Sequence, residues 1–411
     1  MPETTVAAGL GERVDELLAR RTEANAAFFE AKAERLARCC HRMAERFARG
    51  GRLVAIGGSP TARSDARHVA VEFVHPVIVG KRALPAIGLA GEGGDLERQV
   101  EIVAEPEDIA IAYGLDESGV EVARRALDRA RERGCLTIAF SPGAEWEFEP
   151  PGDDPFVRQE LIETLYHVLW ELVHVFFDHR GLLSDRSAGA PLHDPGASSF
   201  LYPFLSESER DLDAVVDDVR RSALMKAAEV GELREQTLSE NREALVAAAA
   251  ELRGRFEAGG KLLAFGNGGS ATDAMDLVAD LREPPSAGWR ARRAIDLTED
   301  ASILTAVAND IGVEEIFQRQ VIAYGGELDA AVALSTSGNS ENLIEALAEA
   351  RGRGLATIAM VGYDGGRIAA ERLADHVVLT RSQHIPRIQE AQASAYHVLR
   401  ELIELAPAAT R

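Results

Sequence analysis

The sequence has few cysteines, no long apolar run and little basic charge. Its three cysteines, Cys39, Cys40 and Cys135, make neither a disulfide framework nor a CxxC metal knuckle. No apolar run approaches the ~20 residues of a membrane-spanning helix, and the first residues lack the apolar core of a signal peptide. We therefore expect no membrane partner and, by default, a cytoplasmic location.

The scarcity of basic residues limits the partners. The chain has 45 Lys and Arg against 67 Asp and Glu, a formal net charge of −22 at pH 7. This balance argues against a nucleic-acid-binding protein, which needs a basic face. The same field repels an anionic substrate, so local donors must hold any phosphate ligand. A length of 411 residues allows two or more domains, each with a full core.

One stretch of the chain, 261–281, indicates an anion site. Leu262–Phe265 is a short apolar run that predicts a buried strand, Gly266–Ser270 predicts a tight turn, and a helical pattern begins at Ala271. A strand, a glycine turn and a helix in this order direct backbone N–H groups and a helix N-terminus at one point. A second polar loop, Ser335–Ser340, also lies between an apolar run and a helical pattern.

The sequence repeats itself, which predicts two similar domains. The matching segments are 45–59 with 254–270, 126–140 with 346–360, and 158–173 with 388–403. Each copy alternates strands and helices, which predicts two α/β domains with largely parallel sheets. We place the domains at 1–180 and 207–411, and the Gly-, Pro- and Ser-rich segment 181–206 as the linker.

Four motifs of the C-terminal half resemble the sugar isomerase (SIS) domain of phosphoheptose isomerases, which convert sedoheptulose 7-phosphate to heptose 7-phosphate. They are GNGGS…DAM at 266–275, VANDIG at 307–312, STSGNS at 335–340, and RIQE at 387–390 with His397. The N-terminal half, over about residues 11–180, is similar to a more diverged copy.

The resemblance implies a fold and an assembly. It implies two tandem SIS domains, each a mainly parallel five-stranded sheet flanked by helices in a flavodoxin-like three-layer sandwich, with an N-terminal helical extension. Members of this family are typically tetramers of single-domain chains with active sites at subunit interfaces. A homodimer of the tandem chain would then mimic such a tetramer.

The loop 335–340 is the candidate phosphate site. Ser335, Thr336, Ser337 and Ser340 gather four hydroxyls at a helix start, which suits a phosphate dianion, although Ser and Thr also favour such turns as ordinary caps. By resemblance, the substrate-binding residues further include Asn267, Gly268, Ser270, Asn309 and Asp310. The corresponding loop of the N-terminal half, 115–119, carries Asp116 and Glu117, which would repel a phosphate.

The candidate metal and acid–base residues are complete in the N-terminal half, whereas the phosphate loop is in the C-terminal half. In the family, a His-x-x-x-Glu helix and a later helix with Gln and a His eight residues on bind zinc in some members, and the Glu and the later His transfer protons. The matching residues of the N-terminal half are His68, Glu72, Gln159 and His167. The C-terminal half has Asp276, Asp280, Gln389 and His397, a degenerate set or a second site.

The two halves are therefore complementary, and we expect one composite site. The C-terminal copy would hold the phosphate, and Glu72 and His167 of the N-terminal copy would isomerise sedoheptulose 7-phosphate to a D-glycero-heptose 7-phosphate through a cis-enediol, towards nucleotide-activated heptose. Zn²⁺ or another divalent metal would assist. The sequence leaves open whether Glu72 is ligand, base or both. Alternatives are an isomerase of another sugar phosphate, a sugar-phosphate sensor or a protein-binding module.

Overall fold

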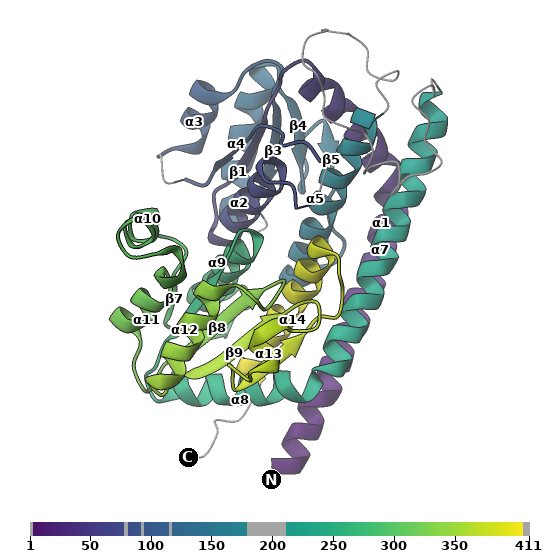
Figure 1. Cartoon of the computed structure of the whole chain (residues 1–411). Coiled ribbons are helices and arrows are strands. Elements are labelled where there is room, and N and C mark those ends of the chain that lie inside the picture. Colours follow the sequence, from purple (N-terminus) through teal and green to yellow (C-terminus); the bar gives the residue numbers. More distant parts are fainter. Residues whose placement is uncertain (1–2, 78–80, 92–93, 115–116, 179–210, 406–411) are drawn as a thin grey trace. The chain divides into compact units, whose positions relative to one another are not determined.

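The computed structural model describes residues 3–77, 81–91, 94–114, 117–178 and 211–405 (Figure 1). The chain divides into two compact units. We call Ala24–Glu229 the N-terminal unit, and Met1–Glu23 with Val230–Arg411 the C-terminal unit. The linker expected at 181–206 lies outside the described residues. The unit boundaries differ from those expected from the sequence, because Leu10, Val14 and Leu17 pack in the core of the C-terminal unit.

The N-terminal unit is an alternation of strands and helices. Its elements are α1 (Glu3–Ala48, which begins in the C-terminal unit), β1 (Leu53–Gly57), α2 (Pro60–Val74), β2 (Ala86–Leu89), α3 (Leu96–Val103), β3 (Ile109–Tyr113), α4 (Glu117–Glu132), β4 (Leu136–Ala139), β5 (Trp146–Glu147), α5 (Pro155–Asp178) and the first part of α7 (Leu212–Glu240).

The C-terminal unit repeats this order. Its elements are the remainder of α7, α8 (Arg242–Glu257), β6 (Leu262–Gly266), α9 (Gly269–Arg282), β7 (Ala294–Asp296), α10 (Ala301–Asp310), the 3₁₀ helix η3 (Val313–Glu315), α11 (Gln318–Tyr324), β8 (Ala330–Ser335), α12 (Glu341–Gly352), β9 (Ala356–Val361), α13 (Gly366–Ala370), β10 (His376–Leu379) and α14 (Ile385–Leu405).

Both units contain a five-stranded sheet in which all the pairings are parallel. The strand orders are β2-β1-β3-β4-β5 and β7-β6-β8-β9-β10, so the two sheets have the same topology. The registers correspond as well: Leu53 pairs with Ile109 between β1 and β3, and Leu262 with Ala330 between β6 and β8. This confirms the expected parallel five-stranded sheets.

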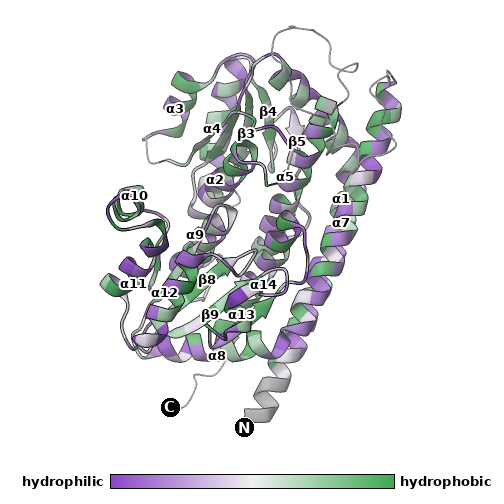
Figure 2. Cartoon of the chain, in the orientation of Figure 1, coloured by the Kyte–Doolittle hydropathy of each residue, from purple (hydrophilic) through white to green (hydrophobic). Residues whose placement is uncertain are grey.

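Each sheet is buried on both faces, which makes each unit a three-layer sandwich. Along β1, Leu53 and Ala55 belong to a core shared with α1, α2 and α5, whereas Val54 and Ile56 belong to a core shared with α3 and α4. Successive residues of a strand point to opposite faces, so this alternation places helices on both sides. The same division holds for β6 and β8. Figure 2 shows strands such as β3, β8 and β9 in the green of hydrophobic residues.

A pair of glycines precedes the strand that is first in sequence in each sheet. A Cβ on Gly51 would lie 2.1 Å from the carbonyl oxygen of Glu107, and one on Gly260 would lie 2.0 Å from that of Leu328. Only glycine fits such an approach of two backbones. Because both copies keep this contact, the chain enters the two sheets in the same way.

The pattern of residues 83–89 predicts a strand, and the structure forms only its second part, because β2 begins at Ala86. The backbone N–H of Leu84 donates to the carbonyl of Phe73 at the end of α2, and Pro85 has no N–H to donate. The first three residues of the pattern therefore close the turn after α2.

The described residues include no helix that is long and apolar enough to cross a membrane. Cys39, Cys40 and Cys135 are buried free thiols, as the sequence indicates. Burial raises the pKa of Cys40 well above its usual range and that of Cys135 to about 11. These thiols therefore fill the core and are not prepared for nucleophilic chemistry.

Candidate active site

The predicted phosphate loop lies at the carboxyl end of β8, directly before α12. Ser335 is buried and its hydroxyl accepts a hydrogen bond from the N–H of Gly338 (3.0 Å), while the Ser337 hydroxyl accepts one from the N–H of Asn339 (3.2 Å). Ser340 is the N-cap residue of α12. In open parallel sheets, ligands bind at the carboxyl ends of the strands, and a helix N-terminus favours anions.

The loop is held in place by glycines that admit no side chain. Gly338 has φ +64°, and a Cβ there would lie 2.1 Å from the carbonyl oxygen of Gly365. A Cβ on Gly362 would lie 2.3 Å from the carbonyl oxygen of Thr336, and the Gly362 N–H donates to the carbonyl of Ser335. The segment after β9 thus packs against the backbone of the phosphate loop.

A cavity of about 680 Å³ opens beside this loop. Ser337 and Asn339 line one side, and the other lining residues are Tyr363, Asp364, Arg381, Ser382 and Gln383. Its size is in the range of small-molecule sites. Arg381, which forms an ion pair with Glu240 (3.0 Å), supplies a positive charge that the sequence analysis missed. Its only sequence signal is its position two residues after β10, at the same edge of the sheet.

The glycine turn between β6 and α9 is attached to the phosphate-loop helix. The side-chain amides of Asn267 and Asn342 exchange two hydrogen bonds, of 3.0 and 2.9 Å. Gly268 at the N-cap of α9 is exposed, and Ser270 is buried in the first turn. The structure therefore brings the two loops predicted from the sequence together, with Asn342 as an additional residue that joins them.

The expected substrate residues of the VANDIG motif lie at the end of α10. Asn309 and Asp310 are both exposed, and the Asn309 amide donates to the Asp310 carboxylate (2.7 Å). Their proposed contact with substrate remains a prediction.

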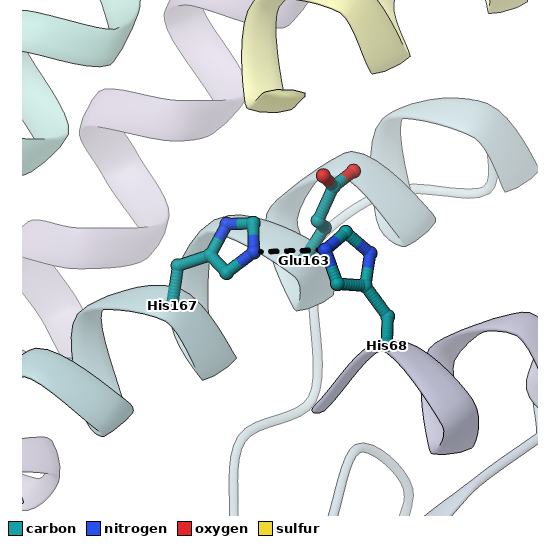
Figure 3. A group of neighbouring side chains, drawn as sticks. All are labelled: His68, Glu163 and His167. Atoms are coloured by element: carbon teal, nitrogen blue, oxygen red, sulfur yellow. Dashed lines mark hydrogen bonds between the residues drawn. The ribbon is translucent and has the colours of Figure 1, made fainter. Parts of the chain in front are cut away.

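In the N-terminal unit, His68 and His167 face each other. Their Nε2 atoms lie 3.3 Å apart, and the Glu72 carboxylate lies 3.9 Å from His68 Nε2. A third carboxylate, Glu163, has an oxygen within 4.8 Å of both imidazoles (Figure 3). All four side chains are at most 4% exposed. The structure therefore brings His68, Glu72 and His167 of the predicted set together, and adds Glu163.

The local sequence explains this arrangement. Ser59 caps α2 by accepting a hydrogen bond from the N–H of Ala62, and His68 and Glu72 are one turn apart on this helix. On α5, Gln159, Glu163 and His167 follow one another at intervals of four residues and share one face. Gln159 is buried, about 12 Å along the axis from His167, with Glu163 midway between them.

This set of donors suits a zinc ion. Two imidazole nitrogens and a carboxylate are a common zinc ligand set. Two nitrogens bound tetrahedrally at zinc distances lie roughly 3.3 Å apart, which equals the observed separation of the two Nε2 atoms. Buried carboxylates also need a nearby cation or hydrogen bonds to balance their charge.

The matching cluster of the C-terminal unit has a different set of donor groups. His397 Nε2 lies 3.3 Å from Asp276 and 3.6 Å from Asp280, and the Tyr396 hydroxyl donates to Asp276 (2.9 Å). Burial, together with the charge of Asp276, holds the pKa of Asp280 well above its usual range, although His397 and Arg400 oppose this shift. Gln389 is buried on the same helix, α14.

Sequence reasoning missed Glu163, although a signal was present. Gln159 and His167 match the family motif, whereas the residue midway between them is not part of it. The equivalent position in the C-terminal unit is Ala393, which follows from the alignment of 158–173 with 388–403. A difference between the two copies at a buried position inside a candidate site was therefore visible in the sequence.

Comparisons with known proteins agree with this fold. The SIS domain family model matches residues 227–362. The phosphoheptose isomerase of Chlorobium phaeobacteroides is 42% identical over 47% of this chain and 82% of its own length, and that of Pelodictyon phaeoclathratiforme is 40% identical over 49% and 92%. The C-terminal domain of the Francisella tularensis glucosamine-fructose-6-phosphate aminotransferase matches 94% of this chain and 93% of its own, with a TM-score of 0.58 at 8% identity, which concerns the fold alone.

The fold and the two loops define a protein of two tandem SIS domains. The chain belongs to the phosphoheptose isomerase family.

Proposed function

We propose that this chain isomerises sedoheptulose 7-phosphate to a D-glycero-heptose 7-phosphate, as a step towards nucleotide-activated heptose. One observation carries the proposal: the two units have complementary sets of residues. The phosphate loop 335–340 belongs to the C-terminal unit, whereas His68, Glu72 and His167 converge in the N-terminal unit. The identity of about 40% to phosphoheptose isomerases supports the choice of substrate.

In this proposal, the two sets act on one substrate in a composite site. The hydroxyls and N–H groups around Ser335–Ser340 bind the phosphate. Glu72 removes a proton from C1 of the open-chain ketose and returns it to C2 of the cis-enediol, while a proton passes from O1 to O2. His167 exchanges protons with these oxygens whenever its Nε2 is not a metal ligand.

The proposal includes a divalent metal, which we take to be zinc. The residues that the family motif selects to hold it are His68, Glu72, Gln159 and His167. When bound, the metal would polarise the substrate oxygens and stabilise negative charge on them. We also propose that the protein is a homodimer, which would resemble a tetramer of single SIS domains. Light scattering coupled to size-exclusion chromatography measures this directly.

The test compares three variants in an assay of sedoheptulose 7-phosphate isomerisation. Glu72→Gln and Ser337→Ala should each abolish turnover, because one removes the base and the other a phosphate contact. Asp280→Asn should retain activity, because the C-terminal cluster does no chemistry in this account. If Asp280→Asn alone abolishes turnover, the C-terminal unit has its own active site and the division of labour is wrong.

A further inference from the structure

The metal ligands of the N-terminal unit need not be those that the family motif selects. The motif offers one carboxylate, Glu72, which the proposed mechanism also needs as its base. A carboxylate that binds a cation loses basicity, so one residue serves both roles poorly. The structure places a second buried carboxylate, Glu163, beside the same pair of imidazoles.

We infer that Glu163, His68 and His167 are the metal ligands of this protein, and that Glu72 is thereby left to act as the base. This inference rests on the proposed function for the role of Glu72. The ligand assignment itself rests on the geometry of the cluster.

Distances favour Glu163 as the carboxylate ligand. One donor atom from each of His68, Glu163 and His167 lies within 4.8 Å of the other two. The two nitrogens are already at the separation that a shared tetrahedral ion requires. In Figure 3, Glu163 extends from its helix beside the two imidazole rings.

Glu163 is nearer to His167 along α5 than Gln159 is, although in the family motif a Gln and a His eight residues apart share one ion. Residues 163 and 167 are one turn apart on α5, about 6 Å along the axis, whereas residues 159 and 167 are two turns apart, about 12 Å. Glu163 is therefore the nearer donor on the same helix face. It is also charged, and an anionic ligand binds a divalent cation more strongly than a neutral amide does.

The repeat supplies an internal comparison. In the C-terminal unit, Ala393 occupies the position of Glu163, and Asp276 occupies that of His68. There the imidazole of His397 contacts two carboxylates directly, and Tyr396 donates to one of them. That cluster could also hold a metal ion, but its donors are one imidazole and two carboxylates. Glu163 therefore occurs in the copy that also has two histidines.

The chain offers a matched control. Glu171 is a buried carboxylate on α5, one turn beyond His167, and it is paired with Lys226. Replacing Glu171 by Gln removes a buried carboxylate from the same helix without touching the proposed ligands. Any general effect of losing a buried charge on α5 should appear in this variant.

The experiment measures Zn²⁺ binding by the full-length chain, without substrate. The affinity comes from competition with a chromophoric chelator, and the stoichiometry from elemental analysis. Wild type should bind about one zinc per chain at this site. Glu163→Gln should lose at least tenfold in affinity, whereas Glu72→Gln and Glu171→Gln should stay within about threefold of wild type. Circular dichroism checks folding, and Glu163→Asp, which keeps the charge, should be intermediate.

A second readout uses Co²⁺ in place of Zn²⁺. The visible spectrum of bound Co²⁺ reports its ligands, so Glu163→Gln should change it and Glu72→Gln should not. The inference is overturned if wild type binds no zinc, if Glu163→Gln keeps full affinity, or if Glu72→Gln loses zinc to the same degree. A zinc-bound wild type that does not isomerise sedoheptulose 7-phosphate would instead refute the proposed function and leave the ligand assignment intact.

Discussion

The Nε2 atoms of His68 and His167 lie 3.3 Å apart, although the two residues are separated by 99 positions in the chain. Two helices, α2 and α5, cover the same face of one sheet, and each presents one imidazole to the other. This approach of two nitrogens suits a shared cation, and Glu163 adds negative charge beside it. The metal binding that we propose for this site depends on these two nitrogens.

Gly338→Ala should disrupt the phosphate loop. Alanine at φ +64° costs about 1 kcal/mol or more, and its Cβ would also meet the backbone of Gly365. We expect a lower free energy of unfolding in urea and a higher KM for the sugar phosphate. Gly352→Ala is the control, because a Cβ at this helical position meets nothing within 4 Å and should be neutral or stabilising. Equal stability of the two variants would contradict the packing described for the loop.

Asn342→Ala should uncouple the glycine turn from α12. It removes both hydrogen bonds to the Asn267 amide, a loss of about 1 kcal/mol or more for the pair. We expect kcat/KM to fall because Asn267 is no longer held in place. Asn267→Ala should have the same effect, and the double variant should lose little more. Additive losses in this double-mutant cycle would show that the two amides act separately.

Tyr363 has φ +52°, an uncommon conformation for a bulky residue, at the edge of the cavity beside the phosphate loop. Strained backbone of this kind clusters at binding sites. Tyr363→Gly should relieve the strain, so the free energy of unfolding should change by less than about 1 kcal/mol. The KM for the sugar phosphate should rise nonetheless. A large loss of stability with an unchanged KM would assign Tyr363 to packing alone.

The buried Asp280 should make stability depend on pH. Its pKa is raised in the folded state, chiefly by burial and then by the charge of Asp276, so the folded state retains this proton at a pH where the unfolded chain has lost it. Its contribution to stability is present below the unfolded pKa and is lost as pH rises through the folded pKa. Asp280→Asn should remove this dependence. Urea unfolding of both proteins across a pH series measures it, and parallel curves would contradict the shift.

The sequence was sufficient for the repeat, the sheets and the loops, because these follow from short patterns. The strands before Gly266 and before Ser335 were predicted almost to the residue, since apolar runs that end in glycine or serine mark buried parallel strands. The candidate phosphate loop could be predicted because its hydroxyls lie within six residues of the chain. The repeat, the strands and the loops can therefore be recognised from residues that are close together in the sequence.

The residues that the sequence analysis missed can be recognised only from contacts between parts of the chain that are distant in sequence. In the sequence, Glu163 looks like an ordinary polar position of a helix. Its role becomes visible only in the fold, where His68 of α2 lies beside it. Arg381 becomes part of a cavity only because β10 lies in the same sheet as β8 and β9. The grouping of residues 1–23 with the C-terminal unit depends on how α1 packs, which its helical pattern does not reveal.

The central claim is that the phosphate and the reacting carbons of one substrate are held by residues of different units. A crystal structure of the inactive Glu72→Gln variant with sedoheptulose 7-phosphate tests it most directly. The account predicts the phosphate on Ser335–Ser340, with C1 and C2 beside residue 72 and His167. It would be contradicted by a substrate whose phosphate lies on Ser335–Ser340 while C1 and C2 lie against Asp276, Asp280 and His397.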